Sequence, residues 1–258
     1  MSLKYGRLPA HPETTHPRVH LADYVPAEAR AAAVATLPGT IDWASKVPTW
    51  PMYLNDQIGD CTCAGVGHAI QAFTAFASTE KTVADNDVLK VYEAVSGYNP
   101  STGANDNGAV EQDVLQYWHD TGMAGHKISA FASVNISSLT DMRLALRWFG
   151  SVYLGINVPQ SAEDQFSAGQ PWAVDPNANN SIIGGHCVVM QEWDPQFARV
   201  VTWGALQRMT WGWFEKYGEE AWVVVTPDFA KSNGLEASGV SVAQLVADFK
   251  ALGGKSYT

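Results

Sequence analysis

The spacing of apolar residues changes past the middle of this chain, and that change limits the folds it can adopt. In the first part, apolar residues recur every three or four positions, which is the spacing of one buried helical face. Helices are predicted over 61–77, 86–97, from 109 to about 122, and 139–149. Farther on, alternation predicts a strand over 151–158, and 186–193, 198–203 and 221–226 are three more strand candidates. Helices followed by strands favour an α+β fold, with a helical half packed against an antiparallel sheet.

Composition narrows the class of protein and of partner. The chain has 258 residues, of which 46% are hydrophobic and 16% charged, so it is long and apolar enough to bury a large core. Its net charge of −10 argues against nucleic acid or an anionic membrane surface as a partner. The N-terminal residues contain no apolar stretch of the kind found in secretion signals, so we expect a cytoplasmic protein, with the virion as an alternative location. No pattern indicates a cofactor.

The prolines and the helix-forming stretches divide the sequence into three regions. Residues 1–36 carry four prolines and one short helix-forming stretch, PAEARAAAVATL, and we expect an arm that lies on the domain. A pro-segment or a partner-binding arm is the alternative. The main domain is expected over 37–230, with a helical lobe over about 55–150 and a sheet lobe over about 151–230. Residues 231–258 are expected to form a C-terminal segment with an amphipathic helix over 240–252.

The stretch NDQIGDCTCAGVGHAI, at positions 55–70, holds two of the three cysteines. Asp60 precedes the predicted helix and is a good N-cap residue, which makes Cys61 the first helical residue. Backbone N–H groups and the positive end of the helix dipole then favour the Cys61 thiolate. Cys63 lies on the apolar stripe and is expected to be a buried packing residue. Cys61 is therefore the expected nucleophile and Cys63 the alternative.

A nucleophilic cysteine needs a base, and His186 is the candidate because it follows SIIGG and opens an apolar strand. Strand alternation would turn Cys187 to the opposite face. The remaining histidines are interpreted as structural: His11, His16, His20, His68, His119 and His126. Zinc bound by Cys61, Cys63, His186 and Cys187 is a weaker alternative, since the C-x-C and H-C spacings are not those of a zinc knuckle. We therefore expect no metal.

Several segments, taken in order, resemble the papain-like cysteine peptidases. The similar segments are LPGTIDWASKVPTWPMYLNDQIGDCTCA, DNGAVEQDVLQYWHDTGM, LTDMRLALRWFGSVYLGINV, GGHCVVMQEWD and VVTWGALQRMTWGWFEKYGEEAWVVV, which together extend over most of 37–226. Each is weakly specific alone, but the five occur in the family's order. The resemblance implies a divergent, bacterial or phage type of this superfamily, with a cleft between a helical lobe and a sheet lobe.

The resemblance also implies roles for single residues. Gln57 would donate its amide to an oxyanion hole, Cys61 or Cys63 would attack, and His186 would shuttle the proton. The family places this glutamine six residues before the cysteine, which fits Cys63, whereas a more distant Asp-Cys-x-x-Ala pattern fits Cys61. The asparagine that orients the histidine in the family is missing. Its place falls at Thr202 when counted from His186, or at Val201 when counted from the Trp-Gly motif.

Two functions follow from these residues. One is a cysteine hydrolase, a peptidase or amidase, that acts on peptide or protein substrates through a Cys-His pair and a thioester. The other is a papain-fold protein without catalysis that binds an assembly partner, such as a virion protein. The retained Gln57, Cys61 and His186 favour the enzyme, and the missing asparagine and short arm favour the binding protein. The sequence does not indicate substrate preference or oligomeric state.

Overall fold

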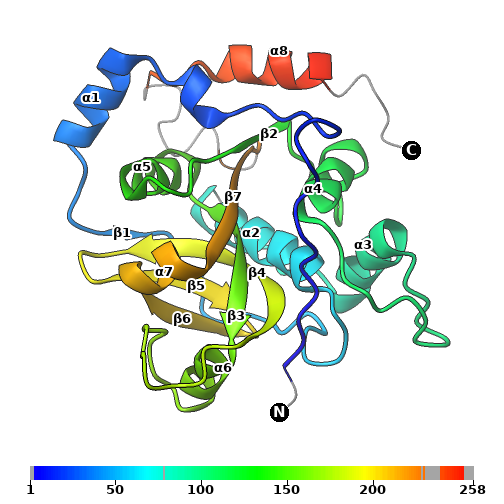
Figure 1. Ribbon diagram of the computed structural model, residues 1–258. Coiled ribbons are helices and arrows are strands. Elements are labelled where there is room, and N and C mark those ends of the chain that lie inside the picture. The colour runs from blue at the N-terminus through cyan, green and yellow to red at the C-terminus, as the bar shows by residue number, and fades with distance from the viewer. Residues whose placement is uncertain (1–2, 78, 228, 230–238, 253–258) are drawn as a thin grey trace.

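The protein is described by a computed structural model that covers residues 3–77, 79–227, 229 and 239–252 (Figure 1). Its centre is a seven-stranded antiparallel sheet in the order β2-β7-β3-β4-β5-β6, with the short β1 also paired to β4. The strands are β1 (Ile41–Asp42), β2 (Ala130–Ser133), β3 (Val152–Pro159), β4 (Ile182–Trp193), β5 (Phe197–Thr202), β6 (Ala205–Thr210) and β7 (Gly218–Val225). The predicted α+β class is confirmed.

The helices surround this sheet, and most of them come from the first part of the chain. They are the 3-10 helix η1 (Leu21–Tyr24) and the α-helices α1 (Ala27–Ala35), α2 (Cys61–Ala77), α3 (Asp85–Ser96), α4 (Glu111–Asp120), α5 (Leu139–Phe149), α6 (Gln160–Ser167), α7 (Trp211–Tyr217) and α8 (Val242–Leu252). In the part of the chain that the structure covers, none of these helices is both long and apolar enough to cross a membrane.

Helix α2 is the buried helix that joins the helical part to the sheet. Its residues are small or apolar along almost its whole length, and all of them from Cys61 to Ala75 are buried. A helix that is apolar on every side has to lie in the interior. Gly65 makes the close packing on the sheet possible, because a Cβ there would lie 2.9 Å from the Tyr153 ring and 3.2 Å from Cys187 Sγ. The N-terminus of α2 is thereby held against the middle of β4.

The register of the sheet places His186 opposite a fixed neighbour. In the β3–β4 pair, Ile156 faces His186 and Gly155 faces Cys187. The next hairpin, β5–β6, closes through Trp203 and Gly204, which have φ values of +44° and +72°. Two successive residues with positive φ are typical of the tight turn that matches the twist of a hairpin. This turn sets Thr202 at the end of β5, beside β4.

Most of the predicted elements are present, and the differences have local causes. Strand β4 begins at Ile182 rather than at residue 186, so His186 lies inside the strand and not at its start. Its two glycines pair with β3 in extended conformation instead of forming a flexible approach. The sequence analysis missed β1, β2, β6, α6 and α7. The predicted C-terminal helix is observed as α8, while residues 231–238 and 253–258 lie outside the described residues.

Candidate active site

The N-terminal arm passes directly over the predicted site. Figure 1 shows it in dark blue, running beside α4 and the ends of the sheet strands. On the helical side, its backbone bonds to Asn55 and Ala109: Lys4 N–H donates to Asn55 O at 3.3 Å, and Leu8 N–H donates to Ala109 O at 3.0 Å. On the sheet side, Gly6 and Arg7 N–H both donate to Gly185 O at 3.1 and 3.0 Å. We call residues 4–8 the plug segment and the surface beneath them the arm groove.

Glycines in both walls allow the plug segment to lie this close. A Cβ on Gly6 would lie 1.8 Å from Gly59 O, and one on Gly185 would lie 2.4 Å from Arg7 O. Side chains at these positions would therefore expel the segment. Gly59, just before the cysteine, is held in place because its N–H donates to Asp106 Oδ1 at 2.8 Å. Residues 1–36 were expected to lie on the domain, and the structure shows that part of this arm fills the arm groove.

Cys61 is the first residue of α2, as predicted, and is only 1% exposed. Its sulfur accepts a hydrogen bond from the backbone N–H of Cys187 at 3.4 Å. The Asp60 carbonyl accepts from the N–H groups of Cys63 and Ala64, at 2.8 and 2.9 Å, which starts the helix. The expected side-chain cap is not formed, because no N–H group of the first turn of α2 donates to the buried Asp60 carboxylate, whose polar neighbour is the Asn55 amide.

His186 is 1% exposed, and among the described residues its ring is hydrogen-bonded through one nitrogen only. Its Nε2 lies 2.7 Å from Thr202 Oγ1, and its ring stacks on Trp203 at 4.3 Å between centroids. Tyr5 of the plug segment packs edge-on against the same ring at 6.0 Å. The other nitrogen, Nδ1, has no hydrogen-bond partner among the described residues. Of the two positions considered for the orienting group, Thr202 is the one that meets the histidine.

The structure brings together only part of the predicted set. Cys61 Sγ bonds to the residue that follows His186 but makes no hydrogen bond to the imidazole ring. Gln57 is exposed, and its amide reaches only Asp56 Oδ1 at 3.5 Å. Cys63 is fully buried within α2 and serves packing, as the apolar stripe predicted.

Asn55 is a residue that the sequence analysis missed. It lies six positions before Cys61, the separation that the family resemblance gives for the oxyanion donor. Its side chain is 2% exposed, and its amide donates to Ile58 O at 3.3 Å within the turn that leads into α2. Counting back from Cys61 instead of forward from Gln57 would have found it.

Burial sets the protonation states of the pair in this conformation. Desolvation raises the pKa of the Cys61 thiol to about 12, although the N–H groups of Cys187 and Gly6 act in the opposite direction. Burial likewise lowers the pKa of His186 to about 3. From the sequence alone, the helix dipole predicts a lowered pKa for the Cys61 thiol. That expectation is wrong for the plugged state, because the cost of burying a charge exceeds the effect of the dipole. Both groups are therefore neutral.

Cys61, Cys63, His186 and Cys187 are not among the described groups whose ligand atoms lie close enough together to share a metal ion. Among the described residues, the one group of three or more His, Cys, Asp or Glu side chains whose ligand atoms all lie within 4.8 Å of one another is His11, His16 and Asp113. Cys187 instead packs against α2, next to Gly65. His68 is also structural, with its Nε2 donating to Pro51 O at 2.8 Å.

Comparisons with known proteins bear on the fold. No family model matches the chain, and no curated protein sequence matches it significantly. Among solved structures, xylellain, a cysteine protease from Xylella fastidiosa, is similar with a TM-score of 0.65 and 17% identity over 86% of this chain and 96% of that one. The chain has the papain-like fold. Procathepsin B S9 from Trypanosoma congolense gives a TM-score of 0.59 at 12% identity, over 85% of this chain and 86% of its own.

A third structure, a recombinant stem bromelain precursor, matches with a TM-score of 0.56 and 12% identity over 76% of this chain and 73% of its own. Identities this low establish the papain-like fold and not the activity. Function has to be argued from Cys61, His186 and the groove around them.

Proposed function

We propose that this papain-like protein is a cysteine hydrolase that cleaves a peptide bond of an extended substrate. One observation carries the proposal: the groove beside Cys61 and His186 already holds an extended peptide, the plug segment. Main-chain hydrogen bonds reach that segment from Gly185 on the sheet side and Ala109 on the helical side. Main-chain bonding of this kind is how an extended peptide is held beside a sheet edge, whatever its side chains. A substrate peptide would use the same partners.

The proposed chemistry uses the two nitrogens of His186 differently. With its proton on Nε2 shared with Thr202, the ring presents the Nδ1 lone pair to the Cys61 thiol and takes its proton. The thiolate adds to the substrate carbonyl carbon, and the tetrahedral intermediate expels the amine, which takes the proton from Nδ1. Water, deprotonated by the same nitrogen, then hydrolyses the thioester and restores the thiol. The orientation of the ring by Thr202 and Trp203 supports this division of roles.

The oxyanion of the intermediate needs two donors. The backbone N–H of Cys61 is one, because the first N–H groups of a helix have no partner inside it. For the second we infer Asn55 rather than Gln57, because Asn55 is buried beside the start of α2 whereas Gln57 is exposed. A rotation of the Asn55 side chain away from Ile58 O would free its amide.

Catalysis by this pair requires that the plug segment leaves. While Tyr5 and Gly6 cover the site, burial holds the thiol and the imidazole neutral. When the plug segment leaves, water enters the site. This removes most of the desolvation that raises the pKa of Cys61 and lowers the pKa of His186. The helix dipole at Cys61 then favours the thiolate, as it does for exposed cysteines at helix N-termini. The groove is thus closed at rest and reactive when open.

A binding protein without catalysis is the second candidate. Two observations favour it: Cys61 makes no hydrogen bond to the imidazole, and Thr202 stands where the resemblance implies asparagine. In this case the groove would hold a segment of an assembly partner in place of the plug segment. Both this proposal and the hydrolase proposal include a cytoplasmic or virion location and a bacterial or phage source.

Trapping of the acyl-enzyme distinguishes the two candidates. The wild-type chain and a Gly6→Val variant, which the groove cannot accommodate, are incubated with a mixture of peptide thioesters and with an epoxide probe for cysteine proteases. Intact mass and peptide mapping then locate the adducts. A hydrolase gives a transient acyl adduct and a stable epoxide adduct on Cys61, both absent in Cys61→Ser and strongly reduced in His186→Ala. Slow labelling that is indifferent to His186→Ala, with His126→Ala as control, would show a binding protein.

A further inference from the structure

The side chain of Arg7 occupies a buried acidic pocket on the sheet side of the arm groove. Its Nη1 lies 2.9 Å from Glu220 Oε1, and the two side chains are only 5% and 6% exposed. Its Nη2 donates to Asn157 Oδ1 at 3.2 Å. Glu220 is fixed by the indole N–H of Trp222, at 3.1 Å, and Asn157 donates to Glu219 at 2.6 Å. The polar atoms around the guanidinium are thus held in place by other contacts.

A second carboxylate faces the same place. Glu111, in the first turn of α4, is fully buried beside Arg7 and Glu220, with the Cys187 and Trp222 side chains as polar neighbours and no well-formed hydrogen bond among the described residues. Two carboxyl groups buried together repel each other when ionised, so they favour a cation between them. Arg7 supplies only one positive charge for both. The pocket therefore has more acceptors than the arm uses.

The floor of the pocket is shaped for a long side chain. A Cβ on Gly155 of β3 would lie 2.7 Å from Arg7 Cδ and 3.0 Å from Glu111 Oε1. Any larger residue at position 155 would close the path along which the arginine stem enters. The entry is next to the proposed reaction centre, since Arg7 follows Gly6, which packs against Gly59 two residues before Cys61.

We propose that Glu111, Glu220 and Asn157 form a guanidinium pocket that selects substrate peptides with an arginine side chain next to the reacting position. This inference rests on the proposed function and adds its substrate class. A planar guanidinium donates to the Glu220 carboxylate and the Asn157 amide oxygen through separate, directed N–H groups, which an ammonium cannot do to the same extent, and Glu111 adds a further buried carboxyl acceptor beside them. The arm binds in the groove because Arg7 presents the group that the pocket selects.

A rescue experiment on the full chain tests the pocket without requiring activity. Arg7→Ala removes the guanidinium and leaves the pocket vacant, and Glu220 also lines a surface cavity of about 490 Å³. We expect propylguanidinium to raise the melting temperature of Arg7→Ala in a saturable way, whereas neutral propylurea does not. The rise is lost in Arg7→Ala/Glu220→Gln. The wild-type chain, whose pocket is filled, shows none.

Peptide selectivity is measured on the same variant. An acetylated glycyl-arginyl-leucine amide is expected to bind Arg7→Ala at least tenfold more tightly than its citrulline analogue, in calorimetric titrations. Equal affinities, or a propylguanidinium effect that survives Glu220→Gln, would overturn the pocket. If the arginine peptide binds selectively but neither peptide is cleaved by any form of the chain, the proposed hydrolase function fails while the pocket stands.

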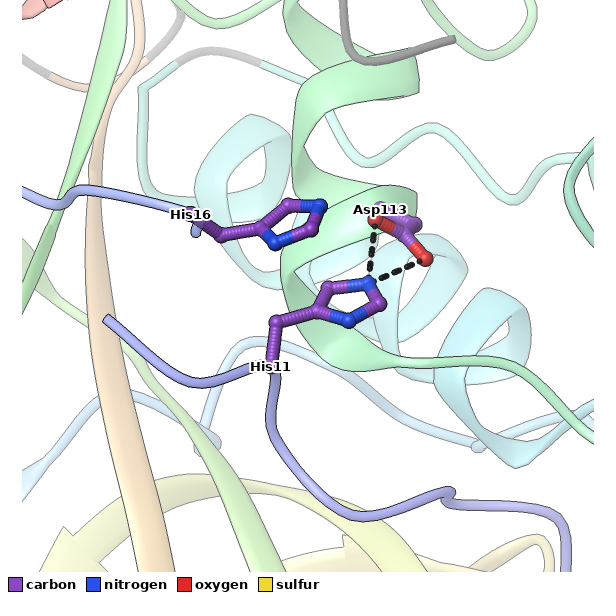
Figure 2. A group of neighbouring side chains, drawn as sticks. All are labelled: His11, His16 and Asp113. Atoms are coloured by element: carbon purple, nitrogen blue, oxygen red, sulfur yellow. Dashed lines mark hydrogen bonds and ion pairs between the residues drawn. The ribbon is translucent and has the colours of Figure 1, made fainter. Parts of the chain in front are cut away.

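A separate cluster of side chains links the arm to α4. Figure 2 shows His11 and His16 side by side on the arm, both next to Asp113 of α4. His11 Nε2 lies 2.9 and 3.0 Å from the two Asp113 oxygens, and the two imidazoles stack at 3.8 Å between centroids. A turn creates this arrangement, because the N–H groups of Thr15 and His16 both donate to Pro12 O at 3.0 Å. Arg18 also donates to His11 O at 2.8 Å.

The structure assigns a divalent transition-metal site to His11, His16 and Asp113. Two imidazoles and a carboxylate are a donor set that zinc accepts, with water in the fourth position. Each of the three residues offers a ligand atom within 4.8 Å of the others, so small side-chain rotations bring them to coordination distances. His11 is four residues from Arg7. A bound ion would therefore tie the arm to α4 just beyond the plug segment and hold the groove closed.

Cobalt(II) substitutes for zinc in the test because its absorption reports its ligands. We expect one cobalt ion per chain, with visible absorption of low-symmetry coordination and no thiolate-to-metal band in the near ultraviolet. Zinc should displace it and raise the melting temperature of the full chain. His16→Asn and Asp113→Asn should lose both effects, and His126→Asn should keep them. A thiolate band, no binding, or binding unchanged by Asp113→Asn would overturn the site.

Discussion

His186 Nε2 lies 2.7 Å from the hydroxyl of Thr202, and this contact fixes one edge of the imidazole ring. Threonine here offers one rotatable hydroxyl where an asparagine would offer a rigid carbonyl. The ring is nevertheless held, because Trp203 stacks on it and comes from the same tight turn. The turn thus supplies both the orienting hydroxyl and the plane on which the ring lies.

Replacement of Thr202 tests that contact. Thr202→Val keeps the shape but removes the hydroxyl, so we expect the free energy of unfolding to fall by about 1 kcal/mol and the acylation rate of Cys61 to fall by up to about tenfold, with a measurable loss. Thr202→Ser should retain most of both. The measurements are urea unfolding and the acyl-adduct assay in the Gly6→Val background. An unchanged rate in Thr202→Val would show that the hydroxyl has only a structural role.

Displacement of the plug segment should expose the thiol. In Gly6→Val the new side chain would meet Gly59 O, so we expect iodoacetamide to alkylate Cys61 faster than in the wild-type chain. Each unit by which the Cys61 pKa falls below about 12 raises the thiolate fraction about tenfold. Gly39→Val is the matched control, since nothing lies within 4 Å of a Cβ at that position. Equal rates in the two variants would contradict the role of the arm as a cover.

Acid should destabilise the fold through its buried histidines. Burial lowers the pKa of His68 to about 4 and that of His186 to about 3, below the value of about 6.5 in an unfolded chain. The unfolded state therefore takes up protons first, and stability is retained above pH ~6.5 and lost as the pH falls toward the folded pKa values. At pH 5 each histidine costs about 2 kcal/mol.

His68→Gln isolates this effect from that of the buried carboxyls. Burial raises the pKa of Asp60 and of Glu111, and these groups act in the opposite direction as the pH falls. The comparison is therefore between variants: the wild-type chain should lose about 2 kcal/mol more than His68→Gln between pH 7 and pH 5 in urea unfolding. A parallel loss in both chains would show that His68 is not neutral in the folded state.

Two glycine-to-alanine changes in helices should have opposite signs. Gly212→Ala in α7 places a methyl group where nothing lies within 4 Å, so the usual helix preference for alanine should add about 0.5–1 kcal/mol. Gly65→Ala in α2 pushes a methyl group against Tyr153 and Cys187, so overpacking should cost about 1–3 kcal/mol. Thermal and urea unfolding measure both. Stabilisation by Gly65→Ala would mean that α2 does not pack closely on β4.

The parts of the fold that the sequence predicts well are those whose pattern is continuous. Helix α2 was predicted with its observed bounds because it is apolar or small throughout and its start is marked by Asp60. Strand β6 was missed because ALQRMT contains three polar residues in six and only one β-branched residue, although the Trp203-Gly204 turn before it could have indicated a hairpin. Helix α6 is short and polar, and only its packing on β3 explains it.

The candidate site divides in the same way. Cys61 lies at a helix start, His186 in a strand and Thr202 at a hairpin. The sequence pattern predicts the positions of these elements. The protonation states could not be predicted, because they depend on burial by Tyr5 and Gly6, far away along the chain. The exposure of Gln57 was equally hidden, since it depends on how the turn before α2 folds. The local pattern of residues along the sequence does not reveal contacts between distant segments.

Because the plug segment belongs to the same chain as the groove, any incoming peptide competes with an intramolecular ligand. A short tether keeps that ligand at an effective concentration of about millimolar, whatever the dilution of the protein. A free peptide in trans therefore has to bind considerably more tightly than the arm to displace it, and assays with weak peptides would report an inert protein. Cutting or pulling the arm changes the competition from unimolecular to bimolecular, which makes physical release of the N-terminus the natural way to open the groove.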